Sequence, residues 1–111
     1  MNLYVSSNVK NRYQVEITTV AERDVEEIWE YISQDNAERA TAFIFDLEKS
    51  IAGLSTLPLR CSLVPENEIL GTAYRHLLYG NYRIIFRVFG SKVIILRVVH
   101  KGRLLDTRFF W

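Results

Sequence analysis

The alternation of apolar and polar side chains predicts a strand followed by a helix in the first third of the chain. Residues 13–18, YQVEIT, alternate at every second position, as in a half-buried strand. The next segment, TTVAERDVEEIWEYISQ, repeats its apolar side chains at the i, i+4, i+7 and i+8 spacing of one helical face. Acidic residues fill its first turns, where they suit the positive end of a helix dipole.

A second helix is expected directly after the short break QDN. Asp35 precedes Glu38 by three residues, a capping-box pattern in which Asp35 would be the N-cap. An apolar stripe then continues until Pro58 stops the helix, and its members are Ala40, Phe43, Ile44, Leu47, Ile51 and Leu54. Because the break is short, the two helices should form an antiparallel hairpin, with Trp29 and Phe43 in the core.

The second half of the chain predicts three strands. Residues 59–71 contain Pro, Gly and polar residues without a period and predict a loop. Three strands follow, separated by the two-residue hairpin signals Gly-Asn and Gly-Ser, at about 72–79, 82–89 and 92–100. The element order is therefore β-α-α-β-β-β, an α+β fold with a helical hairpin packed on one face of an antiparallel-rich sheet. We expect residues 13–111 to form a single domain, preceded by an N-terminal extension over residues 1–12.

Two-residue turns divide the side chains of these strands between two faces. One face, expected to pack on the helices, collects Ala73, Arg75, Leu77, Tyr79, Tyr82, Ile84, Phe86, Val88, Val93, Ile95, Arg97 and Val99. The opposite face collects Tyr74, His76, Leu78, Arg83, Ile85, Arg87, Phe89, Lys92, Ile94, Leu96, Val98 and His100. The pattern thus places Arg83, Arg87 and His100 together. A three-residue loop at 80–82 would move Arg75 beside Arg83 and Arg87, so its face stays open.

The cations of these strands have two possible explanations. A face on which Arg and Lys stand among aliphatic side chains suits a phosphate backbone or an acidic protein. Alternatively, it is an ordinary solvated sheet face. Arg97, on the helix face, is expected to pair with a helix acid such as Glu30 or Glu48, because a buried charge needs a partner.

Composition and charge narrow the class of protein. Apolar residues make up 49% of the 111 residues, enough for a real core. The start, MNLYVSSNVKNR, lacks the apolar stretch of a signal peptide, and the single cysteine, Cys61, cannot form an internal disulfide, so we expect a cytoplasmic protein. Residues 1–59 hold five Lys/Arg against ten Asp/Glu, whereas residues 60–111 hold nine against three, a split from −5 to +6. The basic half either faces a partner or is neutralised by the acidic helices.

The sequence contains no signature of a cofactor or a metal. It has no metal-ligand spacing, no phosphate-cradling glycine loop and no nucleotide fingerprint. We therefore expect neither a cofactor nor a metal, and we expect no membrane association, because no apolar run approaches the roughly 20 residues of a spanning helix.

The chain resembles the RelE/ParE superfamily of bacterial toxins, the toxic halves of type II toxin–antitoxin pairs. The resemblance covers about residues 13–104 and is carried by VEITTVAERDVEEIWEYI, AERATAFIFDLEKSIAGLSTLPLR, YRHLLYGNYRIIFRV and VIILRVVHKGR. It implies a cytoplasmic protein with a cognate antitoxin as partner, and contact with DNA only indirectly, through that antitoxin.

The resemblance leaves two activities open. RelE-type members cleave mRNA in the ribosome, which requires stabilisation of the phosphorane charge and transfer of protons. ParE-type members inhibit DNA gyrase and need no catalytic residues for charge stabilisation or proton transfer. Carried over to this chain, the nuclease residues would be Arg83, Arg103 and His100, the last as general acid or base.

Several features favour the ParE type. The tail DTRFFW offers no tyrosine for proton transfer, and an overall pI near 7.9 is modest for a protein that lodges against ribosomal RNA. The long helical hairpin also resembles the ParE branch. We accordingly expect binding of DNA gyrase, with a ribosome-dependent mRNA endonuclease as the alternative. Residues expected to contact the target or the antitoxin are Arg75, Arg87, Lys101, Phe109, Phe110 and Trp111.

Overall fold

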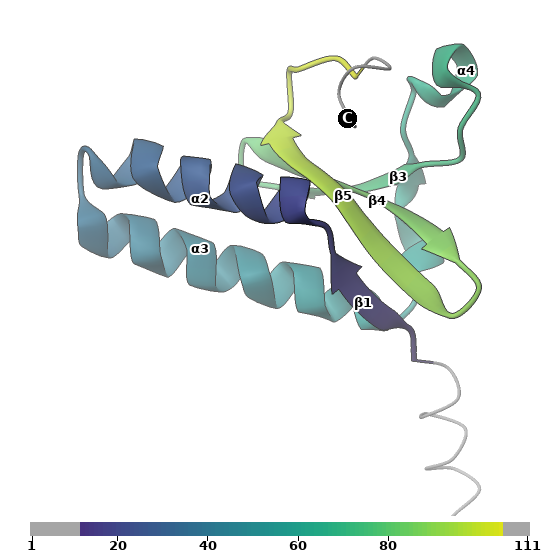
Figure 1. Ribbon diagram of the computed structural model, residues 1–111, viewed down its shortest axis with the longest axis horizontal. Coiled ribbons are helices and arrows are strands. Elements are labelled where there is room, and N and C mark those ends of the chain that lie inside the picture. Colours follow the sequence, from purple (N-terminus) through teal and green to yellow (C-terminus); the bar gives the residue numbers. More distant parts are fainter. Residues whose placement is uncertain (1–11, 106–111) are drawn as a thin grey trace, which may run out of the picture.

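The computed structural model describes residues 12–105 and shows a helical hairpin packed on a five-stranded sheet (Figure 1). The sheet order is β1-β5-β4-β3-β2, in which β1 runs parallel to β5 and the other neighbours are antiparallel. The predicted α+β class is confirmed. The strands are β1 (Gln14–Ile17), β2 (Ser62–Leu63), β3 (Arg75–Tyr79), β4 (Tyr82–Phe89) and β5 (Lys92–His100). The helices are α2 (Thr19–Ser33), α3 (Ala37–Ala52) and α4 (Asn67–Leu70), with 3₁₀ turns η1 (Gly53–Ser55) and η2 (Pro58–Arg60).

Side-chain caps start the two long helices. The Thr18 hydroxyl accepts a hydrogen bond from the Ala21 N–H at 3.1 Å, and the Asn36 side chain accepts one from the Arg39 N–H at 3.0 Å. The predicted N-cap Asp35 is therefore wrong by one residue. Asn and Asp cap equally well, and Asn36 is the residue whose backbone is extended, with φ −157° and ψ 108°, before the helix begins.

The main core lies between the helical hairpin and the sheet. It is built from buried residues of α2, α3 and the strands, including Val25, Ile28, Leu47, Ile51, Ile84, Phe86, Val93 and Ile95. Phe43 packs edge-on against Tyr79 and Tyr82, with ring centroids 5.3 and 5.8 Å apart, as expected for a core residue. Trp29 differs from the prediction, because it is 39% exposed and its indole N–H donates to the Thr41 hydroxyl across the hairpin at 3.2 Å.

Both hairpin turns have the predicted two residues, but a bulge in β5 changes the faces beyond it. Tyr79 pairs with Tyr82 and Phe89 with Lys92. Phe86 then pairs with Ile95 while Ile85 pairs with Arg97, so Leu96 is an extra residue on β5. An extra residue reverses the alternation that follows it. Val98 consequently joins the main core, and Val99 packs on the other face, the reverse of the prediction.

A second, smaller hydrophobic cluster covers part of the opposite face. Val64, Ile85, Val99 and Leu105 are its buried members, with Leu70, Tyr74 and Leu96 packed against them. The segment 59–71 therefore is not the irregular loop that was predicted: it contains η2, β2 and α4, and it packs on the sheet. Its elements are two to four residues long, too short to leave a readable period in the sequence. Within residues 12–105, no helix is long and apolar enough to cross a membrane.

Candidate functional site

Arg83, the strongest candidate from the sequence, is buried inside the protein. Its side chain points from β4 into the second cluster, and the residue is only 4% exposed. The guanidinium forms a bidentate ion pair with Glu66, with Nη1–Oε1 at 3.1 Å and Nη2–Oε2 at 2.5 Å. Nη2 also donates to the Arg103 carbonyl at 2.7 Å. Arg83 thus has its charge neutralised within the fold, and Nε is a buried donor without a hydrogen-bond partner among the described residues.

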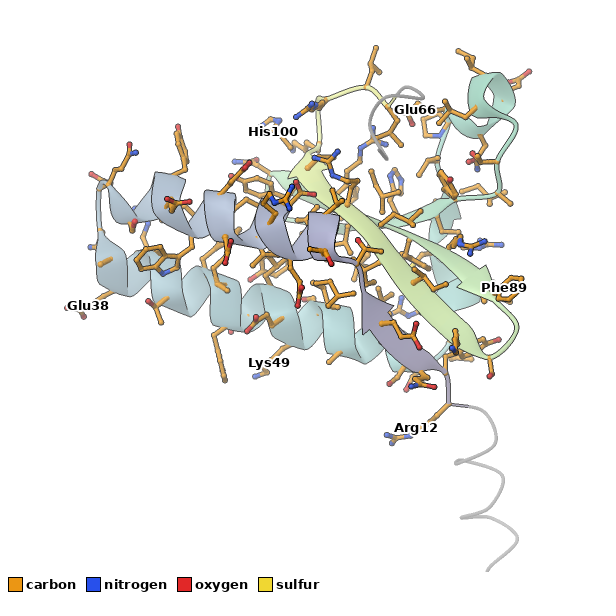
Figure 2. All side chains as sticks on the ribbon, viewed as in Figure 1. Arg12, Glu38, Lys49, Glu66, Phe89 and His100 are labelled. Atoms are coloured by element: carbon orange, nitrogen blue, oxygen red, sulfur yellow. The ribbon has the colours of Figure 1, made fainter. Side chains whose placement is uncertain are left out.

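Glu66 is presented to Arg83 by a loop that Asn67 closes. The Asn67 side chain accepts hydrogen bonds from the Tyr74 N–H at 2.9 Å and the Thr72 hydroxyl at 2.7 Å, and it donates to the Tyr74 carbonyl at 2.9 Å. Such side-chain bonds to nearby backbone are typical of Asn in turns. The loop therefore fixes the position of the carboxylate against the sheet (Figure 2 shows Glu66 beside α4).

The electrostatics of this cluster favour a charged Glu66 and a neutral His76. Hydrogen bonds from Arg83 hold the pKa of Glu66 below its ordinary value of 4.5, against the opposing effect of burial. Its Oε2 also accepts the Leu105 N–H at 3.2 Å. His76 Nδ1 lies 3.3 Å from Arg83 Nη1. Burial, followed by the charge of Arg83, lowers the pKa of His76 from 6.5, so the ring accepts this hydrogen bond in its neutral form.

His100 lies on the helix side of the sheet rather than beside Arg83 and Arg87. The bulge aligns it with Tyr82, and the two rings meet edge-on with centroids 5.9 Å apart. The predicted grouping of Arg83, Arg87 and His100 is therefore wrong. Nδ1 of His100 is 3.2 Å from the Gly102 N–H, which donates to it.

Three exposed basic side chains follow one another where β5 ends, and we name them the β5-end cluster: His100, Lys101 and Arg103. The Lys101 N–H donates to the Asn81 carbonyl at 2.8 Å, which holds this turn against the β3–β4 hairpin. The cluster contacts the buried ion pair through the Arg103 carbonyl, which accepts a hydrogen bond from Arg83 Nη2.

The other predicted cations lie apart from this cluster. Arg75 pairs with Phe86 and so lies on the helix-facing side, and its Nη1 donates to the Cys61 carbonyl at 2.6 Å and the Leu59 carbonyl at 3.3 Å. Arg87 is exposed, and its guanidinium carbon lies 5.2 Å from the centre of the Phe89 ring. Figure 2 shows Phe89 and His100 at opposite ends of the sheet. The predicted contacts Phe109, Phe110 and Trp111 lie outside the described residues.

Arg97 forms a largely buried ion pair with Asp24, which connects β5 to α2. Its Nε and Nη2 donate to the two carboxylate oxygens of Asp24 at 2.7 and 2.8 Å. This pairing raises the pKa of Arg97. A helix acid as partner is confirmed, although the residue is Asp24 and not Glu30 or Glu48.

The sequence interpretation missed Glu66 as the partner of Arg83. A buried arginine needs an acidic partner. Residues 60–111 offer only three acids, Glu66, Glu68 and Asp106, but the helical half offers ten more, so the sequence did not single out Glu66. Across the described residues, no group of three or more His, Cys, Asp or Glu side chains could hold a metal ion.

Arg83 is held inside the fold by its ion pair with Glu66. A paired guanidinium that is 4% exposed cannot approach a phosphate without first breaking its bonds to Glu66. The exposed β5-end cluster can contact an anionic or acidic partner directly. The fold and this surface define a small α+β protein with a basic cluster at one end of its sheet.

Comparisons with known proteins identify the family more closely. Residues 15–105 match the family described as "ParE toxin of type II toxin-antitoxin system, parDE". The chain therefore belongs to the ParE toxin family, as the toxin component of a type II toxin–antitoxin system. No curated protein matches the sequence significantly.

Two solved structures are similar in fold. One is the chromosomal ParDE toxin–antitoxin system from P. aeruginosa, at 22% identity and a TM-score of 0.65, covering 81% of this chain and 97% of that one. The other is the RelBE2 toxin–antitoxin complex from Mycobacterium tuberculosis, at 26% identity and a TM-score of 0.56. The match covers 81% of this chain and 99% of the chain in that structure.

Proposed function

We propose that this toxin arrests growth by binding DNA gyrase and that a cognate antitoxin keeps it silent. The observation that carries the proposal is the buried Arg83–Glu66 ion pair. In a ribosome-dependent nuclease, the arginine at this position would have to stabilise charge on the scissile phosphate. Here the carboxylate of Glu66 already occupies the two donors of Arg83 that such a phosphate would take.

An antitoxin partner is supported by the family and by the two similar structures, both of which are described as toxin–antitoxin systems. Two separate basic sites are available to such partners, the β5-end cluster and, at the other end of the sheet, Arg87. All four side chains are exposed. In this proposal Arg87, Lys101 and Arg103 supply charge for binding, and no proton transfer is required of His100.

The alternative function is a ribosome-dependent mRNA endonuclease. It is favoured by the similarity to the RelBE2 complex and by the exposed position of His100 next to Lys101 and Arg103. In that reading His100 would transfer a proton, and Arg103 would contact the phosphate.

Two assays with purified components separate these functions. In the first, the toxin is added to a translation system that lacks gyrase and contains a preformed mRNA, and mRNA ends are mapped. In the second, gyrase supercoiling and DNA cleavage are followed without ribosomes. We expect intact message together with inhibited supercoiling, whereas new mRNA ends in register with codons would overturn the gyrase proposal.

Variants must be chosen outside the ion pair, because loss of Arg83 would disturb folding as well as function. Arg103→Ala and Lys101→Ala are suitable, with Glu68→Ala on α4 as an exposed control. The gyrase proposal predicts that Arg103→Ala and Lys101→Ala weaken binding of the target. An endonuclease would instead bind the ribosome and lose turnover on Arg103→Ala or His100→Ala.

A further inference from the structure

The side of α3 that faces away from the core carries a short coiled-coil pattern. Ala40, Leu47 and Ile51 are buried on the inner side of this helix. Four exposed residues follow one another on the outer side at alternating spacings of four and three, and we name them the outer stripe: Glu38, Ala42, Phe45 and Lys49. Figure 2 shows Glu38 and Lys49 on the edge of α3 that is turned away from α2. Alternating spacings of four and three are the repeat by which one helix packs on another.

The outer stripe offers both a projecting side chain and a hollow to receive one. Phe45 is 61% exposed, and its ring contacts only the Lys49 ammonium among charged groups, with Nζ 5.5 Å from the ring centre. Beside it lies a hollow of about 550 Å³, whose walls include Glu38, Thr41, Ala42 and Phe45. These four residues have the i, i+3, i+4 and i+7 spacing of a hole that accepts one side chain from a facing helix in a coiled coil.

The outer stripe is complementary to itself when a second copy of α3 runs in the opposite direction. Ala42 and Phe45 are equally far from the midpoint between residues 43 and 44, and so are Glu38 and Lys49. A two-fold axis at this midpoint would place Phe45 beside the partner's Ala42, so that the large side chain meets a small one. It would also place Glu38 beside the partner's Lys49. Each contact occurs twice, as in any interface between identical surfaces.

We propose that two copies of this toxin associate through the outer stripe, with α3 packed antiparallel on α3. Phe45 of each copy fills the hollow of the other, and an ion pair between Glu38 and Lys49 closes each end of the contact. Phe45 is thereby removed from water, as is expected of an exposed aromatic side chain that lies in a patch with partners for its charged neighbours.

The charges of the outer stripe specify the antiparallel direction. Within the described residues, neither Glu38 nor Lys49 takes part in an ion pair of its own chain. A parallel arrangement in the same register would place Glu38 beside Glu38 and Lys49 beside Lys49, which is repulsive at both ends. The antiparallel arrangement turns both contacts into attraction.

The size of the contact sets its strength. From Glu38 to Lys49 the outer stripe is about 17 Å long at 1.5 Å per residue. One such helix pair buries less than the roughly 1,600 Å² of a standard interface, so we expect a dimer that dissociates in the micromolar range, with a dissociation constant of roughly 1–100 µM. The proposal goes beyond the gyrase function, since it concerns a surface outside the basic sites and does not depend on the target.

The first test is sedimentation velocity of the purified toxin, a chain of 13.0 kDa, over a range of concentrations. We expect a monomer–dimer equilibrium. Phe45→Ala should weaken the dimer by about a hundredfold, because two large apolar side chains are lost from the centre of the contact. The matched control is Phe89→Ala, since Phe89 is 64% exposed and lies at the end of the sheet. This control should leave the dissociation constant unchanged within about twofold.

A charge exchange tests whether Glu38 meets Lys49 of the other copy. Glu38→Lys alone and Lys49→Glu alone each oppose like charges at both ends of the contact, so each should weaken the dimer by about tenfold. The two substitutions combined exchange the charges and should restore the dissociation constant to within about threefold of the unchanged protein. Glu68→Lys, at an exposed position on α4, changes the net charge as Glu38→Lys does and should have an effect below about twofold.

Three results would overturn the proposal. A toxin that remains a monomer at about 100 µM would leave the outer stripe to a different protein. A dimer that Phe45→Ala leaves intact would use another surface. Failure of the combined charge exchange to restore association, in a protein whose circular dichroism is unchanged, would exclude the antiparallel contact. None of these results bears on the gyrase and translation assays, so the two proposals fail separately.

Discussion

Two buried arginine–carboxylate pairs tie the sheet of this toxin to its two sides, and they differ in how completely they are satisfied. Arg97 joins β5 to Asp24 of α2, on the side of the helical hairpin. Arg83 joins β4 to Glu66, on the side of the second cluster. Asp24 also accepts the Val98 N–H at 2.9 Å, as Glu66 accepts that of Leu105 at 3.2 Å. In both pairs the carboxylate therefore accepts hydrogen bonds from the arginine side chain and from a backbone N–H.

The difference lies in access to water. The Arg97 side chain is 13% exposed and has Glu27 nearby as a second negative charge, whereas the Arg83 side chain is 5% exposed and keeps a buried Nε without a partner among the described residues. If Asp24 is removed, the charge of Arg97 can reach solvent. If Glu66 is removed, the charge of Arg83 cannot. The same pair of residue types thus supports the fold to different degrees on the two sides.

The largest effect is expected from Glu66→Ala, which would leave Arg83 charged and unpaired in the interior. Breaking a buried pair on one side typically costs about 3–5 kcal/mol of unfolding free energy. Urea denaturation monitored by circular dichroism measures this loss. The double variant Arg83→Met with Glu66→Leu should recover most of it, and a loss below about 1 kcal/mol for Glu66→Ala would show that water reaches Arg83.

A smaller loss is expected from Asp24→Ala, about 1–3 kcal/mol, because Arg97 can turn towards Glu27 and solvent. Urea denaturation under the same conditions gives the comparison. Asp24→Asn is the matched control, since its amide oxygen can still accept the Val98 N–H. The ranking is contradicted if Asp24→Ala destabilises the protein more than Glu66→Ala.

Acidification should weaken the Arg83 side of the sheet first. The folded protein lowers the pKa of His76, so its contribution to stability is complete above pH 6.5 and is lost as the pH falls below that value. The pKa of Glu66 is lowered too, so its contribution is complete above pH 4.5 and is lost on further acidification. His76→Gln should therefore flatten the dependence of unfolding free energy on pH as the pH falls below 6.5. An unchanged slope would exclude His76 as its source.

The smallest effect is expected from Arg87→Ala, at the end of the sheet remote from both pairs. Its contact with the Phe89 ring is of the exposed cation–π type, worth about 0.5–1 kcal/mol. Thermal denaturation should show a shift of only a few degrees. Phe89→Leu serves as the matched control, and a much larger shift for Arg87→Ala alone would reveal a partner other than Phe89.

Local pattern was sufficient to predict the two long helices α2 and α3, the strands β1, β3, β4 and β5, and both turns, but not β2 and α4. The periodicities of α2 and α3 are long, and the Gly-Asn and Gly-Ser turns fixed the register of β3 with β4 and of β4 with β5 at the turns. The bulge at Leu96 could not be seen, because nothing in the apolar run VIILRVV distinguishes an extra residue from regular alternation. That single residue moved His100 to the other face.

The candidate site was harder to predict than the fold. The resemblance made Arg83 a candidate catalytic residue, but the sequence could not show that Glu66, 17 residues earlier, folds over it. That contact depends on the short turns between Pro58 and Leu70 and on the hydrogen bonds of Asn67. For Arg97, by contrast, the predicted position on the helix-facing side of the sheet was enough to predict an acidic partner from the helices, though not which one.

The separation of charge along the chain becomes a separation in space, with consequences for how fast the toxin meets its partners. Residues 1–59, at −5, supply α2 and α3, and residues 60–111, at +6, supply β2 to β5 (Figure 1). Such a molecule carries a dipole and turns in the field of a charged partner before contact. Association should accordingly be fast in dilute buffer and slow down steeply as the Debye length shrinks to about 8 Å at physiological salt.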